Sequence, residues 1–501
     1  MAQSLLRRAG KAVMFNALGN WFGMVGGILS LVFIARLLSP MDFGIYGMTL
    51  VTFAIPEIFA SGSLNESLIQ RRNLQAGHVN SVFMQSLFLA SVFWLGTYLL
   101  APLIAQAFDH PELVPMIRVF AVSLYFGALT SVPAALLQRN LRYSEITIVD
   151  VLGTICAAVV GVTLAFILQN AWALVFMELS RRVIRLVAFA TLAKWTPSFK
   201  SSWTETRELS RYNSLNMATK VVYAIETTIS RGLIGAVLGS AALGMFNMAV
   251  RLQEQAKSAF VTPFSAVALP VASQTQHDLL TLHRAIEGAM RLAGLIAYPT
   301  FIGASVIAPV AVPIVFGEQW IPAITTIQIF LLMGLRSPTT AFNSGVLNGV
   351  GRIDWTFKIT LTGMIVTSMA VAATIHISLE AVAVALMMQS LLIWGLGAYA
   401  VKSSVGFPMH RQVLAGSTAL IASVIMGAVV WVAMQFQPET MTAPVRLMML
   451  VLIGVLTYAG ALASLSPRFA KRALQAAIML LQGRREEAIA LAKGASMGKA
   501  D

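Results

Sequence analysis

The segment "LLSPMDFGIYGM" occupies Leu37 to Met48, and a related segment, "VLGSAALGMFNM", occupies Val237 to Met248. Residues at an offset of 200 share size or chemistry: Leu38 and Leu238, Gly44 and Gly244, Tyr46 and Phe246, and Met48 and Met248. A short segment that recurs so far along the chain indicates an internal duplication. We expect Gly44 and Gly244 to allow a tight backbone turn at this point of each copy.

The composition predicts a membrane protein. Of the 501 residues 57% are hydrophobic and only 11% are charged, whereas soluble domains carry about 25% charged residues. The apolar residues form long runs, such as Ile148 to Leu168 and Ala443 to Leu465. A run of about 20 apolar residues crosses a bilayer as a helix. The sequence therefore predicts an all-α integral membrane fold.

Around the repeated segment we predict about fourteen membrane-spanning helices. They lie at roughly 13–36, 43–62, 80–107, 114–137, 145–167, 172–192, 213–238, 242–270, 286–315, 323–347, 356–375, 380–400, 413–434 and 445–464. One alternate set of loops contains no Lys or Arg, and these loops are 37–42, 108–113, 168–171, 239–241, 316–322, 376–379 and 435–444. By the positive-inside rule both termini are predicted to be cytoplasmic. The net charge of +14 therefore reflects membrane topology and does not indicate binding to nucleic acid.

The duplication extends beyond the first segment. "LLQRNLRY" at Leu136–Tyr143 corresponds to "VLNGVGRI" at Val346–Ile353, at an offset of 210. Six-helix units of this kind have an even number of spans, so both copies keep one orientation and form a parallel repeat, with a substrate site between the halves. The predicted parts are an N-terminal six-helix lobe at 1–211, a second six-helix lobe at 212–402, two additional helices at 403–465 and a basic cytoplasmic tail at 466–501.

Several classes of site are not expected. The one cysteine, Cys156, lies in an apolar span and excludes a disulfide within the chain. The six histidines are scattered, and no Walker loop is present, so we expect neither a metal site nor an ATP-driven motor. We expect no cofactor.

Five segments resemble the polysaccharide transporter family of the multidrug/oligosaccharidyl-lipid/polysaccharide exporter superfamily. They are "FIARLLSPMDFGIYGM" (33–48), "SGSLNESLIQRRNL" (61–74), "VLGSAALGMFNMAVRL" (237–252), "FGEQWIPAITTIQIFLLMGL" (316–335) and "LNGVGR" (347–352). The resemblance implies a non-enzymatic flippase. Such a protein moves undecaprenyl-pyrophosphate-linked oligosaccharide units across the bacterial inner membrane by alternating access, for exopolysaccharide or lipopolysaccharide biosynthesis. Implied partners are the lipid-linked oligosaccharide, membrane lipids, and a polysaccharide polymerase with its export machinery.

Charged residues near mid-depth are candidates for the transport pathway, because a charge at the bilayer centre costs about 2.5–3.5 kcal/mol. The resemblance places helices 1, 2, 7 and 8 around a central cavity. The predicted substrate-cavity residues are Arg251, Lys257, Arg336, Lys220 and Arg231, and the predicted charge-balancing or ion-coupling residues are Glu57, Glu226 and Glu254. Glu254 lies three residues from both Arg251 and Lys257, so an internal ion pair with either one is the alternative reading.

Three other functions remain open. An ion-coupled exporter of drugs or small molecules would suit an acidic cavity, whereas Arg and Lys at mid-depth here at least equal the acids. A membrane glycosyltransferase or polymerase would need larger outer loops than the ten or so residues predicted. A structural scaffold would not need a duplicated charged core.

Overall fold

The computed structural model describes residues 23, 25–61, 68, 74–140, 142–198, 214–265, 268, 272, 278–436 and 441–467. Within these ranges all regular structure is helical, and eleven helices are long and apolar enough to cross a membrane. They cover all of the predicted spans apart from the first and the sixth. Of the first predicted span, the structure describes a shorter apolar helix at Val25–Leu37. The sixth predicted span carries four charged residues and is not among the eleven. The predicted all-α membrane fold is confirmed, while the count of fourteen spans stays a prediction.

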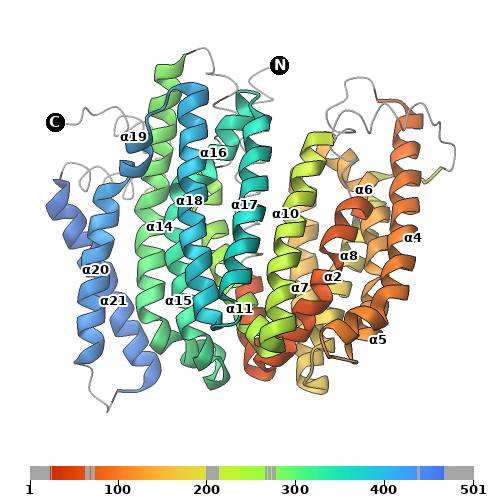
Figure 1. Ribbon diagram of the computed structural model, residues 1–501, viewed down its shortest axis with the longest axis horizontal. Helices are drawn as coiled ribbons and strands as arrows, with labels where there is room; N and C mark the ends of the chain where they lie inside the picture. The colour runs from red at the N-terminus through yellow and green to blue at the C-terminus, as the bar shows by residue number, and fades with distance from the viewer. Residues whose placement is uncertain are drawn as a thin grey trace. The chain divides into compact units, whose positions relative to one another are not determined.

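The chain divides into two compact units, of which the first comprises residues 1–247 and 360–382. Its main helices are α2 (Pro40–Ser61), α4 (Ala76–Ala107), α5 (Leu113–Phe120), α6 (Ser123–Arg139), α7 (Tyr143–Leu168), α8 (Trp172–Ala193) and α10 (Ser214–Leu233). Helix α8 packs against α6 and α7, and α2 packs against α4, α6 and α10 (Figure 1). Phe53 of α2 and Phe120 of α5 are fully buried, with their ring centroids 5.0 Å apart.

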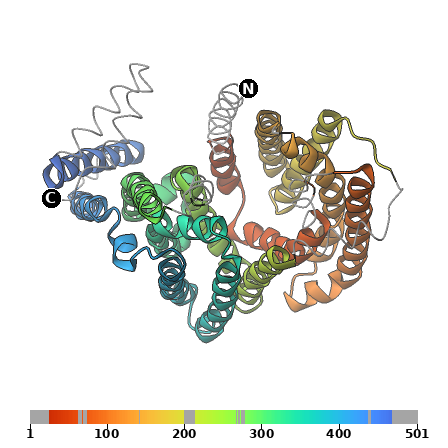
Figure 2. The same cartoon turned by 90° about the horizontal axis from the view of Figure 1, so that it is seen from above.

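The second unit comprises residues 248–359 and 383–501. Its helices are the later part of α11 (Gly239–Phe260), α12 (Thr262–Ser265), α14 (Leu279–Phe316), α15 (Ile324–Met333), α16 (Ser337–Gly349), the start of α17 (Ile353–Thr374), most of α18 (Leu379–Val405), α19 (Met409–Leu414), α20 (Ser417–Gln435) and α21 (Ala443–Leu465). The long helix α14 packs against α15, α16, α20 and α21, and Figure 2 shows the helices of this unit, in green to blue, largely end-on. The predicted lobes at 1–211 and 212–402 follow the sequence repeat and remain a proposal, as do the parts at 403–465 and 466–501; residues 468–501 of the tail lie outside the described residues.

Two segments that correspond in the sequence form the same kind of turn. The Arg142 amide donates to the Leu137 carbonyl at 3.0 Å, and the Arg352 amide donates to the Leu347 carbonyl at 2.7 Å, at the same offset of 210 that relates the two sequences. Each turn starts the next helix one residue later, α7 at Tyr143 and α17 at Ile353. The shared turn agrees with the predicted repeat, which stays a prediction.

The repeated glycines have a different role from the one expected. Gly44 and Gly244 lie inside α2 and α11 and neither has a positive φ; the turn residue is Gly239, with φ of +87°. A Cβ on Gly44 would lie 1.7 Å from the Ser240 carbonyl oxygen, and a Cβ on Gly244 would lie 1.8 Å from the Pro40 carbonyl oxygen. At the offset of 200, Gly44 corresponds to Gly244 and Pro40 corresponds to Ser240, so the two contacts are equivalent. The expectation of a tight turn was wrong: the glycines let the first turns of α2 and α11 pack backbone to backbone.

Candidate functional site

The first unit contains a polar cavity of about 300 Å³. Its walls come from α2, α6 and α8, and the lining residues are Glu57, Phe126, Gly127, Thr130, Ser131, Ala134, Gln138, Glu178, Arg181, Arg182 and Arg185. Ligand pockets in proteins span about 300–1,000 Å³, so this cavity has room for a small polar group or a headgroup.

Helix α8 supplies most of the charge because its sequence is amphipathic. Glu178, Arg181, Arg182 and Arg185 recur at the three- and four-residue spacing that places side chains on one helix face. The exposed apolar residues Phe176, Val183 and Val187 belong to the other side of the same helix. Arg182 is the middle residue of α8, about 15 Å from either end at 1.5 Å per residue. If this helix crosses the membrane, as predicted for 172–192, its charged face has to be turned toward protein or a polar cavity.

Arg182 is held by two carboxylates from different helices. Its Nη1 lies 2.8 Å from Glu57 Oε1 and its Nη2 donates to Glu57 Oε2 at 3.1 Å, which is the forked geometry that a guanidinium offers to a carboxylate or a phosphate. Its Nε donates to Glu178 Oε1 at 2.9 Å. The guanidinium carbon also lies 5.4 Å from the centroid of the Phe120 ring. Arg182 is therefore fixed on every side, with its side chain 16% exposed.

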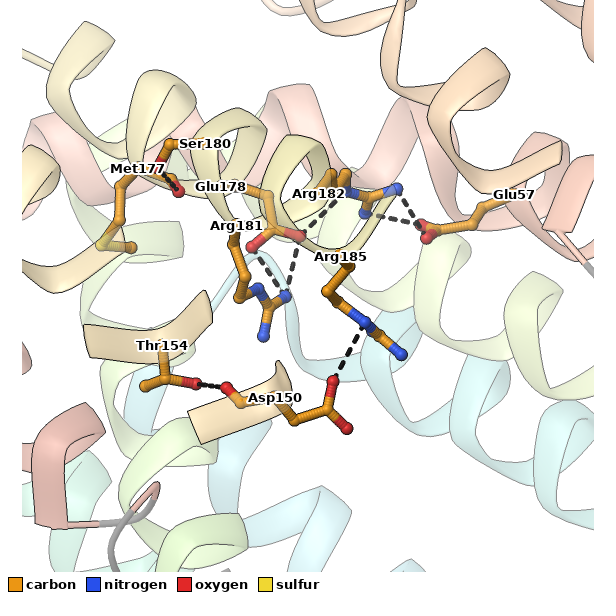
Figure 3. A network of polar contacts seen from close by, with 9 residues as sticks. All are labelled: Glu57, Asp150, Thr154, Met177, Glu178, Ser180, Arg181, Arg182 and Arg185. Atoms are coloured by element: carbon orange, nitrogen blue, oxygen red, sulfur yellow. Dashed lines mark hydrogen bonds and ion pairs between the residues drawn. The ribbon is translucent and has the colours of Figure 1, made fainter. Parts of the chain in front are cut away.

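The other two arginines extend this network, which Figure 3 shows from close by. Arg181 Nη2 lies 2.7 Å from Glu178 Oε2, so the nearly buried Glu178 side chain holds two arginines at once. Arg185 Nε lies 3.1 Å from Asp150 Oδ1 of α7; the two groups are close enough for an ion pair, although Nε is not aligned for a hydrogen bond. The network therefore ties together α2, α7 and α8.

The opposite wall of the cavity is neutral. Thr130 and Ser131 of α6 donate their hydroxyl hydrogens to the carbonyls of Phe126 and Ala128, at 2.6 and 2.7 Å. Their oxygens remain acceptors on the wall of the cavity. The lining carries three arginines and two glutamates, and Asp150, beside Arg185, brings the acids of the network to three. The guanidinium groups present the forked donors that an anionic group such as phosphate accepts.

Among the predicted site residues, Glu57 lines this cavity and balances the charge of Arg182. Three others lie on α10 of the same unit: Lys220 is exposed, and Glu226 and Arg231 are half-buried. The buried Thr367 hydroxyl of α17 donates to Glu226 Oε1 at 2.7 Å. A Cβ on Gly363 would lie 3.8 Å from Glu226 Oε2, an ordinary contact distance, so this part of α17 lies beside the carboxylate.

The remaining predicted residues belong to the second unit. Lys257 Nζ donates to Glu254 Oε1 at 3.2 Å, with side chains 38% and 55% exposed. This is one of the two alternative ion pairs that the spacing of the charged residues on α11 predicts for Glu254. Arg251 is half-buried on α11, and Arg336 is half-buried in the short helix η3 (Gly334–Arg336). None of these four lines the cavity of the first unit.

Sequence reasoning missed the charged face of α8. The segment "ELSRRVIR" at 178–185 lies in the middle of the predicted span 172–192 and carries four charges at helical spacing. That signal was available, since four charges inside one span must have partners or a polar cavity. Within the described ranges, no group of three or more His, Cys, Asp or Glu side chains is arranged to hold a metal ion.

Known proteins of similar sequence are involved in making bacterial polysaccharides. The chain is 21% identical over 338 residues to the lipopolysaccharide biosynthesis protein WzxC of Escherichia coli (strain K12), covering 66% of this chain and 68% of that protein. It is 23% identical over 372 residues to the succinoglycan biosynthesis transport protein ExoT of Rhizobium meliloti (strain 1021), covering 74% of each.

The fold is shared with solved transporters. The lipid II flippase MurJ in an inward closed conformation matches with a TM-score of 0.74 at 13% identity, over 90% of this chain and 98% of that one. An inward-facing multidrug resistance MATE family transporter matches with a TM-score of 0.61 at 13% identity, over 79% and 98%. The sequence profile of one family, described as polysaccharide biosynthesis protein, matches residues 33–325, more than half of the chain. The chain therefore belongs to this family of polysaccharide biosynthesis proteins.

Proposed function

We propose that the protein is a flippase for undecaprenyl-pyrophosphate-linked oligosaccharide units in exopolysaccharide or lipopolysaccharide biosynthesis. The observation that carries this proposal is the arginine-rich cavity at the middle of α8, inside an otherwise apolar bundle. A pyrophosphate has the charge and the acceptor geometry that arginine forks bind. Membership in the family and the similarity to WzxC and ExoT support the same substrate class.

The protein acts by alternating access and without covalent chemistry. The anionic headgroup and its sugars occupy a polar pathway, while the prenyl chain stays in the lipid. Arg251, Lys257, Arg336, Lys220 and Arg231 are proposed as further cationic contacts along this pathway. Glu226 and Glu254 are proposed, with Glu57, to balance that charge or to bind a coupling ion. Membrane lipids are partners by the same proposal, and a polymerase with its export machinery receives the translocated unit.

The ion pairs of the cavity also argue against the second candidate, an exporter of hydrophobic cations. The fold match to a MATE transporter shows the fold alone. Both glutamates of the lining are already paired with arginine, so a cationic drug would have to displace an arginine to reach them.

The proposed function is tested by reconstitution. Purified full-length protein in liposomes should move a fluorescent undecaprenyl-pyrophosphate-linked oligosaccharide from one leaflet to the other, which a membrane-impermeant quencher detects. In cells, deletion of the gene should cause the lipid-linked unit to accumulate on the cytoplasmic face. Liposomes that transport a cationic dye and not the lipid-linked unit would favour the drug exporter instead.

We place the protein in the bacterial inner membrane with both termini in the cytoplasm, and thiol labelling tests this orientation. The starting variant is Cys156→Ser, which removes the single native thiol. In that background a cysteine at the exposed position Gln319, in the short helix η2 (Glu318–Ala323) of a predicted outer segment without Lys or Arg, should react with an impermeant maleimide in intact cells. A cysteine at the exposed Ser403, beside Lys402, should react only after the membrane is opened. The reverse pattern would invert the topology.

A further inference from the structure

The arginines that face the cavity already have carboxylate partners. Arg181 pairs with Glu178, Arg182 pairs with Glu178 and Glu57, and Arg185 lies beside Asp150. An incoming anion therefore cannot simply add to a vacant cation. It has to take the place of a carboxylate, and the structure distinguishes which carboxylate can leave.

The Glu178 carboxylate is held firmly between its two arginines. Its side chain is 10% exposed, it lies on the same helix as both of its arginines, and it contacts both of them at 2.7–2.9 Å. Moving it would expose two arginines and break contacts at the three- and four-residue spacing within one helix. Breaking buried pairs of this kind is costly.

Glu57 is placed differently. It comes from α2, its side chain is 41% exposed, and it occupies the two terminal nitrogens of Arg182. Those terminal nitrogens form the forked face that a phosphate would use, whereas Glu178 binds the Nε of the same guanidinium. Glu57 thus occupies the position of an anionic ligand, and it does so from the solvent-accessible side.

The helix backbone next to Glu57 lacks one of its hydrogen bonds. Pro56 directly precedes it inside α2, and a proline lacks the amide hydrogen that would bond to the carbonyl of Thr52 one turn earlier. The last turn of α2, which carries Glu57 and ends at Ser61, is therefore less firmly attached to the helix than an uninterrupted turn.

We propose that Glu57 is an exchangeable counter-ion that occupies the Arg182 fork in the empty state and yields it to the anionic headgroup. The proposal rests on the proposed function, because the headgroup is the pyrophosphate of that substrate. Displacing Glu57 removes the ion pair that joins α2 to α8. Binding of the headgroup is thereby linked to release of the last turn of α2, and Glu57 returns to Arg182 when the headgroup leaves.

The test measures binding of farnesyl pyrophosphate to the purified full-length protein in nanodiscs of zwitterionic lipid, by calorimetry, with farnesol as the uncharged control. Glu57→Gln removes the competing carboxylate and should lower the Kd about fivefold, the scale of a partly exposed ion pair. In the liposome assay the same variant should lower both KM and the maximal rate, because a headgroup without a competitor leaves slowly.

Glu178→Gln is the matched control, since it removes the same charge from the same arginine. It should not tighten binding, because Arg181 and Arg182 lose the carboxylate that positions them. If both variants tightened binding equally, net charge would explain the result and the proposal would be wrong. Should Glu57→Gln fail to insert, Glu57→Asp, which withdraws the carboxylate by one methylene, should tighten binding by a smaller factor.

The outcomes separate this proposal from the proposed function. If the parent protein binds the probe and Arg182→Gln abolishes binding while Glu57→Gln leaves the Kd unchanged or higher, Glu57 is not a competitor and the function stands. If the parent protein neither binds the probe nor moves the lipid-linked oligosaccharide, the proposed function itself falls, and this inference falls with it.

Discussion

Replacing Gly44 with alanine is expected to destabilise the protein by at least about 1–3 kcal/mol and to reduce transport, because overpacking costs that much even where side chains can adjust. Here the obstacle is backbone, since the new Cβ would lie 1.7 Å from the Ser240 carbonyl oxygen. The first turns of α2 and α11 must separate by more than an ångström before ordinary contact is restored. Gly244→Ala should have a similar effect, because its Cβ meets the Pro40 carbonyl at 1.8 Å. Thermal unfolding midpoints and rates in liposomes measure both changes.

Gly96→Ala is the matched control for this prediction. Gly96 lies in α4 of the same unit, and a Cβ there would meet nothing within 4 Å. In an open helical position alanine is favoured over glycine by up to about 1 kcal/mol, so this variant should be at least as stable as the parent. Equal behaviour of Gly44→Ala and Gly96→Ala would show that α2 and α11 separate without cost.

Replacing Arg182 with alanine is expected to lower transport about a hundredfold, which corresponds to about 3 kcal/mol of lost headgroup binding, the scale of a strong charge-assisted hydrogen bond. The change takes away the guanidinium that Glu57 and Glu178 share, and with it the forked site for the headgroup. Arg182→Lys should retain part of the rate, because an ammonium keeps the charge and loses the fork. The rate per inserted protein molecule in liposomes is the measurement.

Arg291→Ala serves as the control for the loss of an arginine. Arg291 pairs with Glu287 on the surface of α14, with its side chain 49% exposed, and exposed pairs contribute only about 0–1 kcal/mol. That variant should transport at nearly the parent rate. If Arg182→Ala transported equally well, the cavity of the first unit would lie off the pathway, and the cationic residues of the second unit, Arg251, Lys257 and Arg336, would be the next to replace.

Part of the candidate site could be predicted from the sequence. Glu57 was identified because a carboxylate in an apolar span needs a polar partner, and it does line the cavity. The same rule applied to α8 would have found Glu178, Arg181 and Arg182, whose spacing places them on one face. The interpretation of Gly44 went wrong for a different reason. Glycine serves both tight turns and close helix contacts, and a single sequence does not distinguish the two.

The sequence by itself determined the all-helical membrane fold and the spacing of the charges along each helix, and it predicts the duplication. These are local properties, because hydropathy, spacing along a helix and repeated segments are read along the chain. The tertiary structure alone decided which charges meet. Glu57 and Arg182 are 125 residues apart, and Glu226 and Thr367 are 141 residues apart. Such pairs depend on how each helix is rotated about its axis and on which helix it packs against. Side-chain packing across the whole bundle sets that rotation, and no single helix encodes it.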